Sequence, residues 1–352
     1  MINFNELFGQ RPWIIAGPCS AETEEQTLET ARQLAANGVK VFRAGIWKPR
    51  TRPGNFEGVG DEGLEWLKKV KAETGMLTSC EVANAKHIWA AIKSGIDILW
   101  IGARTSANPF AMQEIADSLK GCNIPVFVKN PVNPDVELWL GAIERLEAAG
   151  LTQIGLIHRG FSSYEKIMYR NNPLWNMPIE IKRRRPDLPL ICDPSHIAGK
   201  REYLQEISQM ALDLNVDGLM IESHIDPDKA WSDAKQQLTP AALKEMLSHL
   251  VVRAVAPENA PKESLNELRY RIDQVDGEII KLLQKRKAIV EEIAAYKKSN
   301  NMTVLQPFRW NAMVEKYARM AREAGVDPKT VDTIFQAIHQ SSLDIQNQIV
   351  NK

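Results

Sequence analysis

The strongest chemical signal in this sequence is a set of four possible metal ligands. They are one thiol, one imidazole and two carboxylates: Cys19, His196, Glu222 and Asp233. Such a mixture of soft and hard donors suits a first-row divalent ion and does not by itself select among Mn, Fe, Co and Zn. We expect manganese, with iron, cobalt or zinc as alternatives. Each residue type alone more often packs or hydrogen-bonds, so a metal site is predicted only if the four come together.

Five cationic residues form a second set that could do chemistry: Arg43, Lys48, Arg104, Lys129 and Arg159. Burying an unpaired charge costs on the order of several kcal/mol, so five cations in one site predict an anionic ligand. Arginine binds phosphate and carboxylate through paired hydrogen bonds, and we therefore expect a substrate that carries both groups. In the alternative interpretation these cations pair with acids of the protein itself, namely Glu22, Glu81 and Asp193.

Eight short apolar runs in the first 225 residues would bring these side chains together. Each run is rich in Val, Ile, Leu or aromatic residues, and most are followed by a stretch with helical periodicity. Eight strand and helix units predict a closed (β/α)8 TIM barrel, whose active site lies at the C-terminal ends of the strands. The runs end at Cys19, Arg43, Glu81, Arg104, Lys129, Arg159, His196 and Glu222.

The length of 352 residues suits one barrel plus a smaller domain. Thr239 and Pro240 are typical of a helix start, and the segment PENAPKES, residues 257–264, reads as a linker. We therefore predict a barrel over 1–252, a linker over 253–264 and a helical domain over 265–352.

Composition excludes several classes of protein. Lys plus Arg and Asp plus Glu number 44 each, so no basic surplus indicates nucleic acid or an anionic membrane as a partner. The sequence lacks a membrane-length apolar stretch and a signal peptide, which predicts a cytoplasmic protein. Four scattered cysteines indicate no disulfide framework.

Three helices are predicted after the linker, at about 265–299, 307–324 and 328–350. The first would be roughly 50 Å long, and the two shorter ones cannot cover its apolar face, so we expect a homodimer through this domain.

Helical spacing puts Arg286 and Lys297 on one side of the first helix and Ser342 and Gln346 on one face of the last. Arg269 lies about 100° around the helix from the first pair, and is better placed to serve a partner chain. Arg309 begins the middle helix. On a surface helix such residues are usually only solvated.

The barrel half resembles the 3-deoxy-D-arabino-heptulosonate 7-phosphate (DAHP) synthase family over residues 11 to about 250. The resemblance rests on these motifs: AGPCS (16–20), KPRT (48–51), IGART (101–105), VKN (128–130), HRG (158–160), DPSH (193–196) and SDAKQQL (232–238). That family forms a (β/α)8 barrel and condenses phosphoenolpyruvate with erythrose 4-phosphate, using a divalent metal. Some of its subgroups carry an N-terminal regulatory domain, which we do not expect here.

The resemblance implies a role for each matching residue. The four possible ligands named above would hold the metal, which would polarise the aldehyde of erythrose 4-phosphate. Lys48 would transfer a proton to the developing alkoxide. The substrate contacts divide into three groups: Arg104 and Arg159 for the phosphate of phosphoenolpyruvate, Arg43, Lys48 and Lys129 for its carboxylate, and Arg50 and Thr51 for erythrose 4-phosphate. The rival within this fold is the sibling synthase that uses arabinose 5-phosphate, and KPRT favours erythrose 4-phosphate.

Residues 264–350 resemble the all-helical chorismate mutase family, an intertwined dimer that rearranges chorismate to prephenate. The matching strings are LNELRYRIDQVDGEIIKLLQKRKAIVEEIAAYKK (265–298) and IFQAIHQSSLDIQ (334–346). The resemblance implies that Arg286 and Arg309 bind the carboxylates and that Arg269 reaches in from the other subunit. Lys297 and Gln346 would donate to the ether oxygen beside Ser342.

This helical region departs from the family at Gln306 and Trp310, where members often place acidic residues beside the substrate hydroxyl. Two functions stay open for the region: a working mutase, or a module that senses chorismate or prephenate. In either case we expect prephenate to inhibit the synthase.

Overall fold

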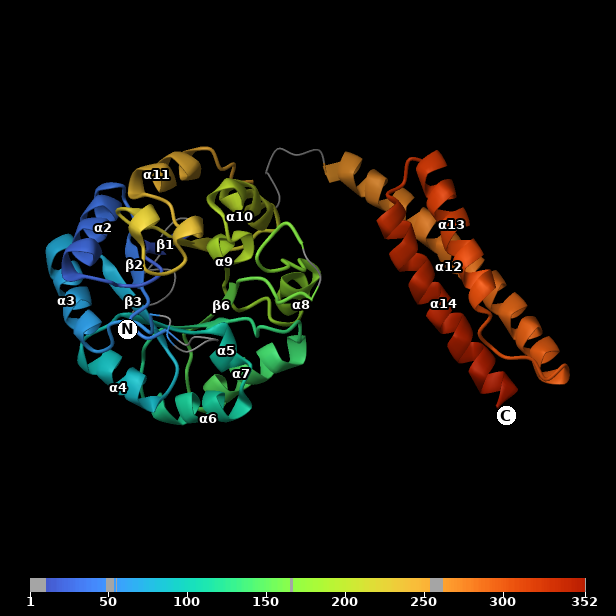
Figure 1. Cartoon of the computed structure of the whole chain (residues 1–352), viewed down its shortest axis with the longest axis horizontal. Helices are drawn as coiled ribbons and strands as arrows, with labels where there is room; N and C mark the ends of the chain where they lie inside the picture. The colour runs from blue at the N-terminus through green and yellow to red at the C-terminus, as the bar shows by residue number, and fades with distance from the viewer. Residues whose placement is uncertain (1–10, 49–53, 55, 165–166, 254–261, 352) are drawn as a thin grey trace. The chain divides into compact units, whose positions relative to one another are not determined.

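The computed structural model describes residues 11–48, 54, 56–164, 167–253 and 262–351, with the backbone alone at 262–264, 307–309 and 311. The chain divides into two compact units, residues 1–255 and 256–352, and each is described by itself (Figure 1). The predicted linker, 253–264, lies mostly outside the described residues, so the predicted domain boundaries stay predictions. Among the described residues, no helix is both long and apolar enough to cross a lipid bilayer.

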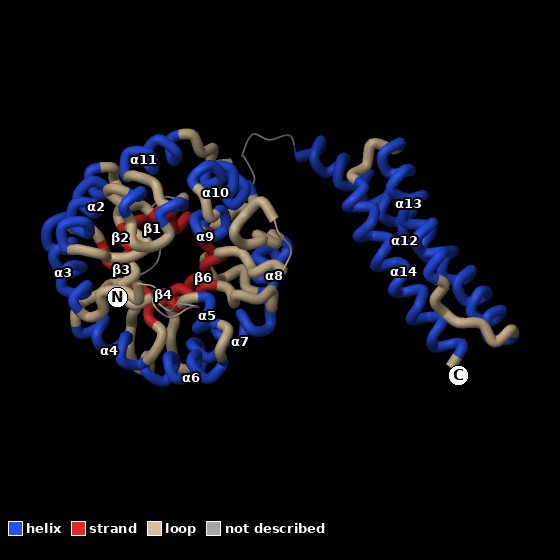
Figure 2. The backbone as a smooth tube through the Cα atoms, viewed as in Figure 1, coloured by secondary structure: helices blue, strands red, loops and turns tan. Residues whose placement is uncertain are grey.

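The first unit is a closed barrel of parallel strands in sequence order, as predicted. Figure 2 shows strands lying inside a surrounding layer of helices. Each apolar run of the sequence forms one strand, because a parallel strand buried on both faces needs a nearly continuous apolar sequence. The ring closes where the first strand pairs with the last, with Gly17 beside Glu222. The strands are β1 Trp13–Gly17, β2 Val41–Ala44, β3 Leu77–Val82, β4 Ile98–Ile101, β5 Val126–Lys129, β6 Ile154–His158, β7 Leu190–Cys192 and β8 Gly218–Glu222.

Helices surround the strands in Figure 1 and cover their outer face. Side chains cap several of them; Thr239 accepts a hydrogen bond from the Ala242 N–H ahead of Pro240, which confirms the predicted start of the last barrel helix. The barrel helices are α2 Glu24–Ala36, α3 Glu62–Thr74, α4 Ala85–Lys93, α5 Ala103–Ser106, α6 Pro109–Ser118, α7 Val136–Ala148, α8 Asn176–Arg184, α9 Pro194–Ala198, α10 Leu204–Asp213 and α11 Pro240–Ser248.

A separate apolar cluster fills the inside of the barrel, beneath the mouth. Its members are Trp13, Ile15, Val41, Ile98, Trp100, Phe127, Ile157, Ile191 and Met220. Side chains two residues apart on a strand point to the same face. Arg43, Lys129 and Glu222 follow Val41, Phe127 and Met220 at that spacing, so their side chains also point inward, one layer higher. The two-residue period of the strands therefore places the charged side chains of Arg43, Lys129 and Glu222 directly above the apolar cluster inside the barrel.

The second unit consists of α12 Lys262–Ser299, α13 Pro307–Glu323 and α14 Pro328–Val350. Predicted and observed bounds agree within three residues, because Pro307 and Pro328 occupy the first helical positions and Asp327 accepts from the N–H groups of Lys329 and Thr330. Along α12, the apolar side chains of Ile272, Ile279 and Leu282 are exposed by 60%, 50% and 62% in the single chain. The three helices thus leave part of the apolar face of α12 uncovered.

Candidate active sites

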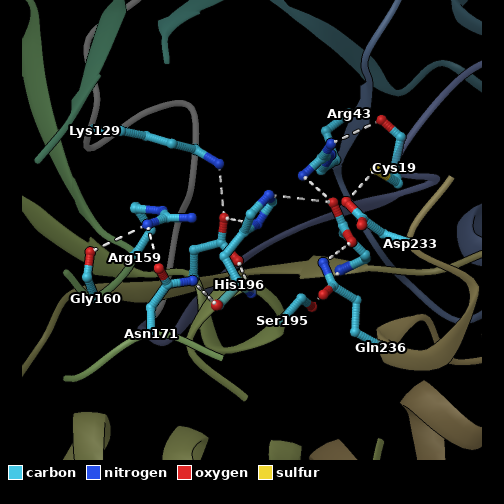
Figure 3. Close-up of polar contacts among 12 residues, drawn as sticks. Cys19, Arg43, Lys129, Arg159, Gly160, Asn171, Ser195, His196, Asp233 and Gln236 are labelled. Atoms are coloured by element: carbon cyan, nitrogen blue, oxygen red, sulfur yellow. Dashed lines mark hydrogen bonds and ion pairs between the residues drawn. The ribbon is translucent and has the colours of Figure 1, made fainter. Parts of the chain in front are cut away.

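Three of the four predicted ligands meet at the barrel mouth. Cys19, Glu222 and Asp233 each offer one ligand atom, and these atoms lie within 4.8 Å of one another. Cys19 follows β1 and Glu222 ends β8, and the pairing of these two strands brings them together. Asp233 comes from the segment between β8 and α11, and its Oδ2 accepts from Cys19 Sγ at 3.3 Å (Figure 3).

His196 lies at the edge of this cluster. It was predicted to end the seventh strand, but β7 stops at Cys192 and His196 sits on the short helix α9, which Asp193 caps. Its Nδ1 lies 2.8 Å from Asp193 Oδ2 and its Nε2 3.9 Å from Glu222 Oε1. Burial lowers the pKa of His196, so the ring is neutral, and a carboxylate beside one nitrogen leaves the other free to bind a metal.

The cluster has the chemistry of a site for a divalent cation. Glu222 Oε1 is buried without a hydrogen bond, whereas Glu222 Oε2 accepts from Gln236 Nε2 at 2.6 Å. Burial, and then the charge of Glu222, raises the pKa of the Cys19 thiol to about 12. A bound cation would compensate the buried carboxylate and stabilise the thiolate. The donors present therefore fit a first-row divalent ion.

Arg43 and Lys48 stand beside the cluster. Arg43 is buried under the site, with its guanidinium 4.9 Å from the centre of the Trp100 ring and its Nη1 3.4 Å from Glu222 Oε1. Its Nε and Nη1 are buried without a hydrogen-bond acceptor. Lys48 Nζ donates to the backbone oxygen of Cys19 at 2.7 Å and lies 3.0 Å from Cys19 Sγ. Unused donors on a buried cation indicate a site for an anion.

The remaining predicted cations line the other side of the mouth. Lys129 Nζ pairs with Asp193 Oδ2 at 2.7 Å, and Arg159 Nη1 donates to Asn171 Oδ1 at 2.9 Å (Figure 3). Arg104 was predicted to end a strand but lies on α5, one turn past β4, and its side chain is exposed. Burial, together with the nearby positive charges of Arg170 and Arg104, lowers the pKa of Arg159 to about 10. Like charges held this close favour an anion between them.

The alternative pairing of these cations with protein acids is confirmed for Asp193, which holds Lys129. The other two acids have different contacts. Glu22 lies beside His224 and accepts from the backbone N–H of Trp231, and Glu81 Oε2 accepts from Trp100 Nε1 at 3.3 Å. Arg50 and Thr51 lie outside the described residues.

Several polar residues that were not predicted surround the cluster. Arg170, from the segment between β6 and α8, donates to Asp233 Oδ1 at 3.0 Å and to Gln236 Oε1 at 2.7 Å. Gln237 Oε1 accepts from the Cys19 N–H at 2.9 Å. The two glutamines stand in the SDAKQQL motif three and four residues after Asp233, a signal that could have identified them; Arg170 carries no such signal.

The helical unit brings together four of its six predicted site residues. Lys297 Nζ donates to Gln346 Oε1 at 3.0 Å, and Arg286 Nη1 donates to Ser342 Oγ, so both pairs link α12 to α14. Burial lowers the pKa of Lys297. Arg269 lies exposed on α12, and the side chain of Arg309 is outside the described residues. Arg286 and Ser342 also line a pocket of about 510 Å³ between α12 and α14.

Comparison with known families agrees with both units. Residues 7–255 match the model of the DAHP synthetase I family. The chain belongs to this family. Residues 268–347 match the chorismate mutase type II family. A DAHP synthetase I barrel followed by a chorismate mutase type II domain indicates a transferase and an isomerase in one chain.

Individual relatives match the DAHP synthetase I region. A phospho-2-dehydro-3-deoxyheptonate aldolase of Thermotoga maritima is 36% identical, with 67% of this chain and 68% of the relative covered. A crystal structure under that name from the same organism matches with a TM-score of 0.60 and 34% identity, over 67% of this chain and 66% of that one. This chain thus spans about two thirds of their length. A 2-dehydro-3-deoxyphosphooctonate aldolase of Geobacter metallireducens is 30% identical over 70% of this chain and 93% of its own.

Proposed function

We propose that the chain is a cytoplasmic bifunctional enzyme. Its barrel would condense phosphoenolpyruvate with erythrose 4-phosphate to give DAHP and phosphate, and its helical domain would convert chorismate to prephenate. The synthase assignment depends on one observation: a metal-type cluster, Cys19, Glu222 and Asp233, lies beside the buried Arg43. The Nε of Arg43 makes no hydrogen bond, and its Nη1 has only the ion pair with Glu222.

Cys19, His196, Glu222 and Asp233 would hold the metal ion, Mn²⁺ in our proposal, with Fe²⁺, Co²⁺ and Zn²⁺ as alternatives. When bound, such an ion supplies Lewis acidity to the aldehyde oxygen of erythrose 4-phosphate. The protein's contribution is to orient the ligands: Asp193 holds the His196 ring, and Gln236 holds Glu222.

The cations would bind the two ends of phosphoenolpyruvate. Arg43 and Lys129 point into the barrel in the same layer as Glu222 and suit the carboxylate. Arg104 and Arg159 lie close enough for one to lower the pKa of the other, and suit the phosphate. Substrate binding would thus relieve the repulsion between like charges and hold the methylene carbon near the aldehyde.

Lys48 is our candidate for the proton donor. Burial alone would lower the pKa of Lys48, but the nearby negative charge of Glu222 helps to raise it, so Lys48 is an ammonium ion at neutral pH. The methylene carbon of phosphoenolpyruvate bonds to the aldehyde carbon, and the developing alkoxide takes its proton from Lys48. Water then adds to the cationic carbon that bears the phosphate ester, and the proton that this water loses restores the ammonium form of Lys48. The bond from that carbon to the phosphate oxygen breaks, the hydroxyl proton passes to the departing phosphate, and the ketone of DAHP forms.

Arabinose 5-phosphate is the second candidate for the sugar substrate, because the chain is also similar to a 2-dehydro-3-deoxyphosphooctonate aldolase. The test is phosphate release from phosphoenolpyruvate with each sugar phosphate, before chelation, after chelation and after return of Mn²⁺. We expect release with erythrose 4-phosphate alone, lost on chelation and restored by metal. Release with arabinose 5-phosphate would refute the sugar assignment, and release unaffected by a chelator would refute the metal.

In the helical domain we propose that Arg286 and Arg309 bind the carboxylates of chorismate, that Ser342 lines the pocket, and that Arg269 enters from a second subunit. Lys297 and Gln346 would donate to the ether oxygen, which gains negative charge as its bond breaks. Their buried contact at 3.0 Å supports this pairing. The exposed apolar face of α12 supports the homodimer that the proposal needs.

We also propose that prephenate inhibits the synthase reaction, whether or not the helical domain turns over chorismate. The check is phosphate release by the intact chain at saturating prephenate. Unchanged release would refute feedback, and a chain that binds prephenate without converting chorismate would be a sensor.

A further inference from the structure

Glu22, four residues after Pro18, is a buried carboxylate to which the proposed chemistry assigns no role. Its side chain is only 6% exposed and has two partners from a distant part of the chain. Glu22 Oε1 accepts from the backbone N–H of Trp231 at 2.7 Å, and Glu22 Oε2 lies 3.4 Å from His224 Nε2. Both partners belong to the segment that follows β8, referred to here as the β8–α11 segment, residues 223–239.

The hydrogen bonds of His224 determine which of its nitrogens faces Glu22 as a donor. His224 Nδ1 accepts from the Asp226 N–H at 2.9 Å, so the proton of a neutral ring is on Nε2. That N–H points to Glu22 Oε2. Each oxygen of the Glu22 carboxylate therefore meets a donor from the β8–α11 segment.

Asp233 lies in this same segment, two residues after Trp231, in a backbone conformation that needs support. Its φ is +49°, in the left-handed region, which is disfavoured for residues other than glycine. Such a conformation persists where the surroundings hold it. The hydrogen bond that Glu22 accepts from the Trp231 N–H is one of the contacts close enough to hold it.

Two more contacts tie the residues after β1 to the same stretch. Ser20 Oγ and Ser232 Oγ lie 2.5 Å apart, and the Cys19 N–H donates to Gln237 Oε1 at 2.9 Å. With Glu22, these contacts attach the chain on both sides of Asp233. The segment that supplies the Cys19 ligand therefore also holds the segment that supplies the Asp233 ligand.

We propose that Glu22 is a positioning residue that holds Asp233 in place to bind the metal, an inference that rests on the proposed metal site. Through the N–H of Trp231 it fixes the backbone next to Asp233, and through His224 it fixes the start of the same segment. Loss of the carboxylate would let the Asp233 ligand move away while leaving the reacting groups intact.

The test measures Mn²⁺ binding to the full-length, metal-free protein, with free Mn²⁺ followed by electron paramagnetic resonance. Glu22→Ala should weaken binding by about 10- to 100-fold, the usual effect of losing a group that orients a metal ligand. Glu22→Gln should weaken it less, because the amide oxygen still accepts from Trp231 while its NH₂ group faces the N–H of His224. Glu25→Ala, an exposed neighbour on α2, is the matched control and should bind as the unmodified protein does.

Turnover separates positioning from catalysis. At saturating Mn²⁺, kcat for phosphate release by Glu22→Ala should stay within about 3-fold of the unmodified protein, while the Mn²⁺ concentration for half-maximal rate rises by the factor seen in binding. A fall in kcat that excess Mn²⁺ does not restore would overturn a positioning role.

Asp233→Ala distinguishes failure of this inference from failure of the metal site. If Asp233→Ala binds Mn²⁺ weakly and Glu22→Ala binds it normally, Glu22 has no positioning role. If Asp233→Ala itself binds Mn²⁺ normally, the proposed ligand set is wrong. If Glu22→Ala lowers the Tm of the metal-free protein and Glu22→Gln does so equally, with equal losses of affinity, the residue is only structural and the inference fails.

Discussion

Lys48 is the residue whose contacts most directly suggest a chemical step, because its ammonium group reaches both the backbone oxygen and the sulfur of Cys19. Lys48→Met keeps most of the length of the side chain and removes the ammonium group that would donate the proton. We expect turnover to fall by about 10²- to 10⁴-fold, the usual contribution of a general acid, with Mn²⁺ still bound. Phosphate release and Mn²⁺ titration of the same preparation check this, and near-normal turnover would rule out the assignment.

In the helical domain, the residue to test is Gln346, the proposed hydrogen-bond donor to the ether oxygen. Removing a preorganised donor to a developing negative charge costs about 10²- to 10³-fold in rate, so Gln346→Ala should slow prephenate formation by that order. Gln340→Ala, exposed on the same helix, is the control. A Gln346→Ala variant with the full mutase rate would refute the placement.

The buried thiol of Cys19 leads us to expect that metal affinity depends on pH. Burial and Glu222 raise the pKa of its thiol to about 12, so the thiol is protonated between about pH 6 and 9 and a metal must displace its proton. Because the bound form has lost a proton, affinity should rise with pH, by about tenfold per unit for one proton. The measurement is Mn²⁺ titration at several pH values, and an equally steep dependence in Cys19→Ala would assign the released proton to another group.

At the scale of elements, the close approach of the ends of β1 and β2 depends on Gly45. A Cβ at this position would lie 2.6 Å from the backbone oxygen of Cys19 and 2.9 Å from Lys48 Cδ. Gly45→Ala should therefore force these strand ends apart, weaken Mn²⁺ binding and destabilise the fold by about 1–3 kcal/mol, as overpacking does. Denaturant unfolding and Mn²⁺ titration measure both effects.

The control for this substitution is Gly277→Ala on α12, where an added Cβ would meet nothing within 4 Å. It should leave Mn²⁺ binding unchanged. If Gly45→Ala behaves in the same way, the strand ends tolerate a methyl group between them.

Elements were more predictable than the contacts between them. Each strand could be found because its apolar residues are consecutive in the sequence. Since alternate side chains of a strand point to the same face, the inward direction of Arg43, Lys129 and Glu222 follows from the apolar residues two positions before them. His196 and Arg104 were predicted at strand ends but lie on the short helices α9 and α5, because a single helical turn has too few residues to show a period. Arg170 could not be found, and Glu22 was paired with the cations instead of His224 and Trp231, since the partners of both residues depend on the paths of long, aperiodic loops.

At the scale of the whole molecule, the uncovered face of α12 predicts self-association. Ile272 and Ile279 lie two turns apart on one side of the helix. In a single chain their side chains are 60% and 50% exposed, respectively. Placing Lys at both positions should dissociate the proposed dimer, because burying unpaired charge is costly. Sedimentation measures the dissociation.

The same double variant should lose most mutase activity if Arg269 acts in the site of a second subunit. Phosphate release by the barrel serves as an internal control for folding. A double variant that sediments as the unmodified protein does would contradict dimerisation through this face, and a monomer with full mutase activity would contradict the role of Arg269.

Cys19 and Asp233 lie 214 residues apart in the chain, yet they face each other across the seam where β1 pairs with β8. During synthesis on a ribosome, the thiol therefore emerges long before the carboxylates that complete its site. A metal ion held by Cys19, Glu222 and Asp233 would link the ends of β1 and β8, the first and last strands of the barrel. Metal binding would then accompany closure of the barrel. In a cell short of metal, the pairing of β1 with β8 would be the least stable part of the newly made barrel.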